Sequence, residues 1–225
     1  MKTLGVLGGM GPAATVAFLA RVQALTPAKG DADHIRVVMD MNPQVPDRNI
    51  RPGDAEAELG AMARRLVQAG AQVLAMPCNT AHAQAAGIRA AGVPFIDMIA
   101  ATVTAAQATG AQATGVGAVG VLATGGGRAL YAPALQAAGM RPVLLEDDDQ
   151  ARFMALIYAV KAGDVGPDRR AEMRTLGQRL LAAGAGAVVA GCTEVPLLLD
   201  EGDLDAPLID SAEVLARACV EMCGS

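Results

Sequence analysis

Two segments of this 225-residue chain are similar in sequence and lie 114 positions apart. Residues 65–78 read RLVQAGAQVLAMPC and residues 179–192 read RLLAAGAGAVVAGC, and both segments end in a cysteine. Two shorter matches occur at offsets of 115 and 113, namely LGVL at 4–7 with VGVL at 119–122, and two P-x-I-D elements that end at Asp97 and Asp210. Three matches in the same order and at nearly one offset indicate a duplicated structural unit.

Short apolar runs alternate with longer helical patterns in both halves of the chain. The runs that we predict as strands are 3–8, 35–41, 72–77 and 94–97 in the first half, and 117–123, 142–146, 186–191 and 207–210 in the second. A helix over 13–25 is entered through Pro12, a favoured first helical residue, and apolar residues recur at helical spacing from Leu59 to Leu66. This alternation predicts right-handed βαβ units and parallel sheets. We expect an α/β fold of two similar domains related by a pseudo-twofold axis, each a parallel sheet flanked by helices.

Two stretches without charged residues, 3–20 and 98–127, raise the question of a membrane segment. The sequence GGMGP at 8–12 interrupts the first stretch, and glycines among Thr and Gln interrupt the second. We expect buried strands with their turns in both places, no targeting segment, no membrane contact and a cytoplasmic location. The four cysteines are then expected to be reduced thiols.

Composition argues against nucleic acid as a partner. The chain has a formal charge of −5 and only 2% aromatic residues, so it would repel a phosphate backbone and has few rings on which bases could stack. With 52% hydrophobic residues it has enough apolar surface to fold into a core.

The repeat gives the two cysteines at its ends equivalent positions. Cys78 and Cys192 each follow an apolar strand, and ligands of open parallel sheets bind beyond the carboxyl ends of the strands. Two halves related by a pseudo-twofold axis would place these thiols on opposite walls of one cleft between the domains, a common place for a small-molecule pocket. Such a pair suits inversion at a carbon acid, because one thiolate removes the Cα proton and the opposite thiol protonates the other face.

A catalytic thiolate requires a pKa below the free value of about 8.5. CNTAH (78–82) and CTEVP (192–196) each follow a strand and open a polar turn, so we expect helix N-termini to stabilise the anions. Thr80 and Thr193 are expected to cap these turns, and Asn79 to orient a substrate carboxylate.

Other uses of the cysteines and glycines are less well supported. Cys219 and Cys223, spaced i,i+4, are expected to fill the core under a final amphipathic helix. A metal site is not expected, because the chain has no Cys-x2-Cys pair and only His34 and His82. A disulfide between Cys78 and Cys192 would require oxidation.

Nucleotide cofactors are also poorly supported. The pattern G-x-G-x-x-A at Gly9, Gly11 and Ala14 imitates a dinucleotide-binding fingerprint, with Asp40 as the ribose-binding acid, but no such crossover follows Asp40. A tight turn is the plainer interpretation. No phosphate-loop motif is present, and we expect no pyridoxal phosphate or other cofactor.

An amino-acid substrate brings carboxylates that need cationic partners. Arg48 lies in NPQVPDR, a proline-stiffened loop after the second strand, which belongs to the site end of the sheet. On position alone, Lys161 is a surface charge at the end of a helix.

The chain resembles cofactor-independent aspartate racemases of the aspartate/glutamate racemase family over nearly its whole length. The motifs that carry the resemblance are LGGMGPAAT (7–15), NPQVPDR (42–48), MPCNTAH (76–82), IYAVKAG (157–163), AGCTEVP (190–196) and PLID (207–210). The resemblance implies a homodimer, no cofactor and two-base racemisation by Cys78 and Cys192. It further implies carboxylate contacts from Arg48 and Lys161. The remaining implied site residues are Met10, Asn79, Thr80, Thr124, Thr193 and Glu194. We expect residues 1–99 with 208–225 to form the first domain and residues 100–207 the second.

One turn departs from the family pattern, which bears on the substrate. LATGGGRALY (122–131) keeps Thr124 but continues with three glycines, and Arg128 could meet a distal carboxylate or face water. Aspartate is the expected substrate. The alternatives are a racemase for another amino acid such as glutamate, a related isomerase or decarboxylase, and a non-catalytic amino-acid sensor.

Overall fold

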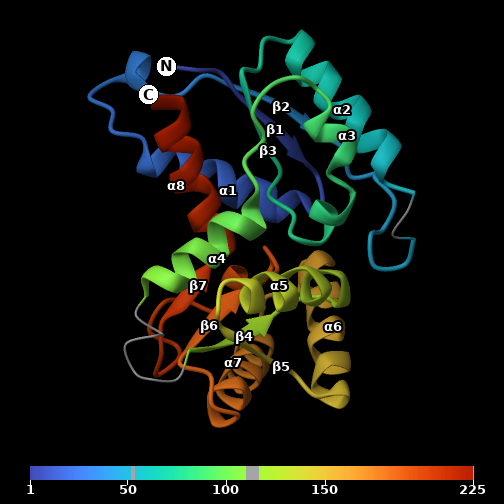
Figure 1. The fold of residues 1–225 in the computed structure, drawn as a ribbon, viewed down its shortest axis with the longest axis vertical. Coiled ribbons are helices and arrows are strands. Elements are labelled where there is room, and N and C mark those ends of the chain that lie inside the picture. Colours follow the sequence, from blue (N-terminus) through green and yellow to red (C-terminus); the bar gives the residue numbers. More distant parts are fainter. Residues whose placement is uncertain (52–53, 110–116, 225) are drawn as a thin grey trace. The chain divides into compact units, whose positions relative to one another are not determined.

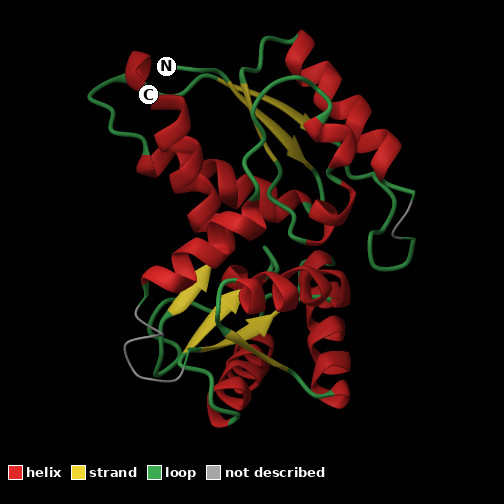
Figure 2. Ribbon diagram, viewed as in Figure 1, coloured by secondary structure: helices red, strands yellow, loops and turns green. Residues whose placement is uncertain are grey.

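The computed structural model describes residues 1–51, 54–109 and 117–224. The chain divides into two compact units, the first formed by Met1–Ala101 with Ala212–Ser225 and the second by Thr102–Ser211 (Figure 1). Each unit is a parallel sheet flanked by helices (Figure 2), which confirms the predicted α/β class. Residues 110–116 of the second charge-free stretch lie outside the described residues.

The first unit is built on a three-stranded parallel sheet of order β2-β1-β3. Its strands are β1 (Leu4–Gly8), β2 (Val37–Met41) and β3 (Val73–Ala75). Its helices are α1 (Pro12–Leu25), α2 (Glu56–Gln68), α3 (Ala86–Arg89) and most of α8 (Ser211–Gly224), with short 3₁₀ turns η1 (Asp31–Asp33) and η2 (Thr80–Gln84). Helices α1 and α8 contribute Phe18, Leu215 and Cys219 to one core, and α2 contributes Leu59 and Met62 to another.

The second unit has a four-stranded parallel sheet of order β5-β4-β6-β7. Its strands are β4 (Ala118–Leu122), β5 (Arg141–Leu144), β6 (Ala187–Ala190) and β7 (Leu208–Asp210). Its helices are α5 (Gly125–Ala137), α6 (Asp147–Lys161) and α7 (Pro167–Ala182), and a 3₁₀ turn, η3 (Val195–Leu197), follows β6. The predicted apolar face of α6, including Phe153 and Ile157, is buried in one core with α7 and the sheet. Helix α4 (Met98–Ala108) connects the two units.

Residues that match in the sequence repeat also pack in the same way in the two units. A Cβ atom on Gly5 of β1 would lie 2.6 Å from Cβ of Ala71, and one on Gly120 of β4 would lie 2.9 Å from Cβ of Leu180 and 3.2 Å from Cβ of Ala185. Ala71 and Ala185 are themselves a matched pair of the repeat. Because Gly5 and Gly120 have no side chain, each leaves room for the alanine that follows the matched helix. This alanine is Ala71 after α2 in the first unit and Ala185 after α7 in the second.

The P-x-I-D elements differ from the prediction. Residues 94–97 form only a single bridge beside β3, between Leu74 and Phe95, whereas the second element forms strand β7 beside β6. Because β7 hydrogen-bonds to β6, residues 208–211 belong to the second unit, and not to the first as expected. The first boundary lies between Ala101 and Thr102, inside the continuous helix α4, and not at its start.

No helix in the described part of the chain combines the length and apolar character that crossing a bilayer requires.

Candidate active site

In the first unit, three segments that follow the three strands meet at the carboxyl edge of the sheet. Met10 follows β1, Arg48 lies in the loop after β2, and Cys78 follows β3. The Nη2 of Arg48 donates to the carbonyl oxygen of Met10 at 3.4 Å and lies 4.0 Å from the Sγ of Cys78. The structure thus brings together three residues that were proposed from separate motifs.

The loop after β2 holds Arg48 with its own backbone. Asn42 begins the loop by accepting the N–H of Gln44 at 2.9 Å, and the Nη1 of Arg48 donates to the carbonyl oxygens of Val45 and Pro46. The side chain is only 8% exposed, and its Nε has no hydrogen-bond partner among the described residues. A buried, fixed guanidinium with a spare donor is suited to bind a carboxylate.

The glycines after β1 serve the close approach of this loop. Gly9 has a φ of +93°, and a Cβ atom there would lie 2.5 Å from the backbone of Asn42. The turn therefore packs against the neighbouring chain segment, in agreement with the interpretation as a tight turn.

Cys78 is 5% exposed and precedes the two predicted polar residues Asn79 and Thr80, which are also buried. The predicted helix N-terminus is absent at this position, because the next element is the 3₁₀ turn η2. Asn79, and not Thr80, is the N-terminal flanking residue of η2, and its side chain makes no capping hydrogen bond.

His82, to which sequence reasoning assigned no role, supports the Cys78 turn. The N–H of Met98 donates to the Nε2 of His82 at 3.1 Å, so Nε2 carries no proton, and Nδ1 must donate to the carbonyl oxygen of Cys78 at 2.9 Å. The ring also stacks on Phe95. His82 thereby connects the thiol turn to the first residue of α4. The signal in the sequence was its spacing of four residues from Cys78 in MPCNTAH.

Replacing His82 by Leu is expected to reduce the free energy of unfolding by about 1–3 kcal/mol, since two buried backbone groups lose their partner. His82→Gln, whose amide both donates and accepts, is the matched control and should retain most of that stability. Denaturant unfolding measures both variants, and equal stability of the two would contradict the role assigned to His82.

The same histidine predicts a pH dependence. Burial lowers the pKa of His82 below its usual value of 6.5, so the folded chain keeps the ring neutral while the unfolded chain takes up a proton. Stability should therefore decrease as the pH falls below about 6.5, and less so in His82→Gln.

In the second unit, the thiol lies beside a carboxylate. Cys192, 7% exposed, donates from Sγ to the Oε2 of Glu194 at 3.0 Å, and the Oγ1 of Thr193 donates to the same oxygen at 3.3 Å. The other carboxylate oxygen, Oε1, has no partner among the described residues. Thr193 therefore does not cap the following turn, for which Glu194 is the N-terminal flanking residue.

The pKa of Cys192 is raised well above its ordinary value, opposite to our expectation for a catalytic thiolate. Burial disfavours the anion, and the negative charge of Glu194 and its hydrogen bond add to the shift. The short 3₁₀ turn η3 replaces the helix N-terminus that we expected to lower it. Burial and Glu194 thus favour the protonated thiol of Cys192 over its anion.

Replacing Glu194 by Gln should lower the pKa of Cys192, because the neutral amide no longer repels a thiolate. The measurement is the pH dependence of alkylation of Cys192 by iodoacetamide in a Cys78→Ala background. The exposed Glu201 of the same unit gives the control Glu201→Gln, which should leave the profile unchanged. If the pH dependence of alkylation were unchanged in Glu194→Gln, the carboxylate would not be what keeps the thiol of Cys192 protonated.

The other predicted residues of this unit, Thr124 and Lys161, differ in burial. Thr124 follows β4 and caps α5 by accepting the N–H of Gly127 at 3.3 Å. Lys161 ends α6 and is exposed, with its ammonium 5.6 Å from the ring centre of Tyr158. Its charge acts on Cys192 by lowering the pKa of that thiol, against the larger effect of burial.

Two interpretations were open for Arg128, namely contact with a distal carboxylate and exposure to water. The side chain is half-buried in the first turn of α5. Its Nη1 donates to the Oε1 of Gln150, whose Nε2 donates to the carbonyl oxygen of Ala123 at 3.0 Å. Gln150 thus connects the guanidinium to the segment that follows β4.

Similar proteins have the same fold. An aspartate racemase from Picrophilus torridus is 27% identical, with a TM-score of 0.81, and the match covers 100% of this chain and 95% of that one. The glutamate racemase RacE1 from Bacillus anthracis is 19% identical, with a TM-score of 0.65 over 99% of this chain and 82% of that one, a likeness of fold. The broad specificity amino-acid racemase RacX from Bacillus subtilis (strain 168) is 28% identical over 224 residues, 96% of either chain.

A parallel α/β chain with a buried thiol at the sheet edge of each unit thus has the architecture of an amino-acid racemase. The chain belongs to the Asp/Glu/Hydantoin racemase family, whose profile matches residues 7–219. It is accordingly an isomerase, as the sequence resemblance implied.

Proposed function

We propose that this chain racemises an amino acid, aspartate foremost, by proton transfer between Cα and the thiols of Cys78 and Cys192. The observation that carries the proposal is a pair of polar atoms that have no partner among the described residues, the Nε of Arg48 beside one thiol and the Oε1 of Glu194 beside the other. An amino-acid zwitterion offers a carboxylate to the first and an ammonium to the second.

The two thiols would have opposite roles in each direction of the reaction. Cys192 holds its proton towards Glu194, so it is the acid that delivers a proton to one face of Cα. In that direction of the reaction, Cys78 acts as the base and removes the Cα proton from the other face. One turnover leaves Cys78 protonated and Cys192 as the anion, and the opposite enantiomer reverses both transfers. The proposal requires the carboxyl edges of the two sheets to face one cleft, as the pseudo-twofold predicts.

Other residues have supporting roles in this proposal. Arg48 and Lys161 would bind carboxylates. The remaining positioning residues would be Met10, Asn79, Thr80, Thr124 and Thr193. We propose no cofactor for this reaction, a cytoplasmic location and a homodimeric assembly.

Polarimetry tests the reaction. The purified chain should abolish the optical rotation of L-aspartate without any added cofactor, and a panel that includes L-glutamate and neutral amino acids would establish the substrate preference. In D₂O, solvent deuterium should enter Cα as either enantiomer is inverted. Binding of aspartate without loss of rotation would contradict the proposal and indicate an amino-acid sensor.

A further inference from the structure

Strand β2 is the outer strand of the first unit's sheet, and no strand in the described part of the chain pairs with its other side. The N–H of Leu4 donates to the carbonyl oxygen of Arg36, and the N–H of Asn42 donates to that of Gly8. Even-numbered residues of β2 therefore turn their backbone groups towards β1. Because these directions alternate along a strand, Val37, Met39 and Met41 turn their N–H and C=O groups away from it. Such an edge can pair with a further strand.

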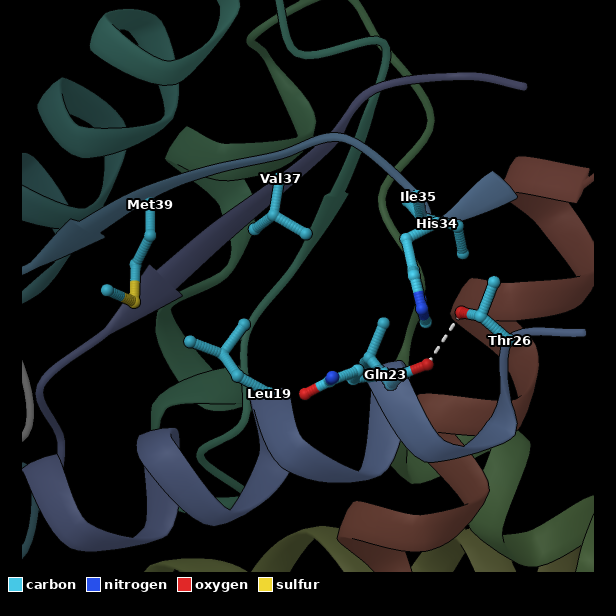
Figure 3. Close-up of a pocket in the computed structure, with 8 residues that line it drawn as sticks. Leu19, Gln23, Thr26, His34, Ile35, Val37 and Met39 are labelled. Carbon is cyan, nitrogen blue, oxygen red and sulfur yellow. Dashed lines mark hydrogen bonds between the residues drawn. The ribbon is translucent and has the colours of Figure 1, made fainter. Parts of the chain in front are cut away.

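The side chains beside this edge are apolar and exposed. Val37 and Met39 are 37% and 41% exposed, and Val16 on the neighbouring helix α1 is 58% exposed. Figure 3 shows Val37 and Met39 above Leu19 of α1, around a pocket of about 480 Å³. We call Val16, Leu19, Val37 and Met39 the β2 edge surface. Apolar surface that adjoins an open strand edge is typical of a protein interaction site.

The opposite face of the strand carries charge. Arg36 and Asp40 lie two residues either side of Val38, and they share its face of the sheet because side chains alternate along a strand. Val38 packs with the core under α2, and Asp40 pairs with Arg65 of α2 at 2.7 Å. The charges at the two ends of β2 are thus opposite in sign.

A second copy of the same strand complements this pattern. In an antiparallel pair with its twofold axis at Val38, Val37 hydrogen-bonds with the partner's Met39, and Arg36 lies opposite the partner's Asp40 on both sides of the axis. A twofold axis at Met39 would instead place Arg36 opposite the partner's Asn42, and Ile35 opposite the partner's Pro43, which has no N–H to donate. The charges and the donors therefore favour the axis at Val38.

We propose that the β2 edge surface binds a second copy of this chain, with the two β2 strands antiparallel about a twofold axis at Val38, in one continuous six-stranded sheet. The inference deepens the proposed homodimer by naming its surface. Val37, Met39 and Leu19 of both copies would then cover one another on the α1 side of the sheet.

Analytical ultracentrifugation of the full chain tests the surface. Wild type should sediment as a dimer at micromolar concentration. Val37→Lys with Met39→Lys should raise the dimer dissociation constant roughly 100-fold or more, since two unpaired charges replace the apolar centre of the interface. Val165→Lys, at a 43% exposed valine of the second unit, is the matched control and should leave the constant unchanged. A monomeric wild type, or a dimer that the double variant does not weaken, would overturn the proposal.

Two further variants remain informative if the double variant folds poorly. Met39→Pro removes an N–H that points away from β1, so it should weaken the dimer while circular dichroism stays native. Val38→Cys should form an interchain disulfide on mild oxidation, because residues opposite each other in a non-hydrogen-bonded pair have Cα atoms only about 4.5 Å apart. Asp40→Cys on the same face should not, since its opposite number is Arg36. Crosslinking by Met39→Cys in place of Val38→Cys would place the axis elsewhere and overturn the register.

The same preparations separate this inference from the proposed reaction. Active wild type that sediments as a monomer would refute the surface and leave the racemisation intact. A dimer that fails to racemise any amino acid in the panel would refute the reaction and leave the surface intact.

Discussion

Cys78→Ala and Cys192→Ala should each abolish racemisation, by a factor of about 10³ or more, while the fold is retained. Each variant lacks one of the two groups that we propose exchange a proton with Cα, and positioned acid–base groups contribute about 10²–10⁴-fold each. A two-base inversion needs one group on each face of Cα, so the loss of racemisation rate should be similar for either enantiomer. Polarimetry measures the rate, and circular dichroism reports on the fold.

The chain supplies its own control for this experiment. Cys219 is also a buried thiol, but it lies in the core between α8, α1 and the sheet. Cys219→Ala should lose some stability and retain the activity. In D₂O, each catalytic variant should still exchange the Cα proton of only one enantiomer, without inverting it. Full activity in either single variant would refute the assignment of two bases.

Arg48→Ala should reduce kcat/KM by about 10²–10³-fold, the second largest effect that we expect. The change removes the guanidinium whose spare Nε is proposed to bind the substrate carboxylate, and a charge-assisted bidentate pair in a buried site is worth several kcal/mol. Arg48→Lys should recover little, because an ammonium group has only three N–H donors, and bonds to Val45, Pro46 and Met10 would leave none for the substrate.

The matched control is Arg51→Ala, three residues along the chain. Arg51 is exposed and forms a surface ion pair with Asp54, so its removal should change neither kcat/KM nor the free energy of unfolding by much. Equal losses in the two variants would point to a general effect of positive charge on the substrate, and not to a fixed binding contact.

Much of the fold could be predicted because burial and periodicity are local properties. The central strands β1, β4 and β6 are continuous apolar runs, and their predicted ranges match those observed within one or two residues. The element at 94–97 could not be predicted as a single bridge, since its sequence resembles that of β7. The difference lies in how much of each element hydrogen-bonds to its neighbouring strand.

The positions of the candidate residues in the fold could be predicted from the sequence, and their electrostatics could not. The repeat placed Cys78 and Cys192 at sheet edges, and a proline-rich loop indicated Arg48. The hydrogen bond from Cys192 to Glu194 depends on side-chain rotamers, which no spacing reveals, and it helps to shift the pKa of the thiol upwards where a decrease was expected. The role of His82 depends on the N–H of Met98, sixteen residues away.

The pairing of Cys192 with Glu194 also bears on oxidation. Peroxides react with thiolates and hardly with thiols, and the first product, a sulfenic acid, would end proton transfer. Cys192 is therefore expected to resist oxidation while it is protonated, and mass spectrometry of peroxide-treated protein with and without Glu194→Gln would detect the difference. The carboxylate that delays ionisation would thus protect this one cysteine, and not Cys78, from oxidants.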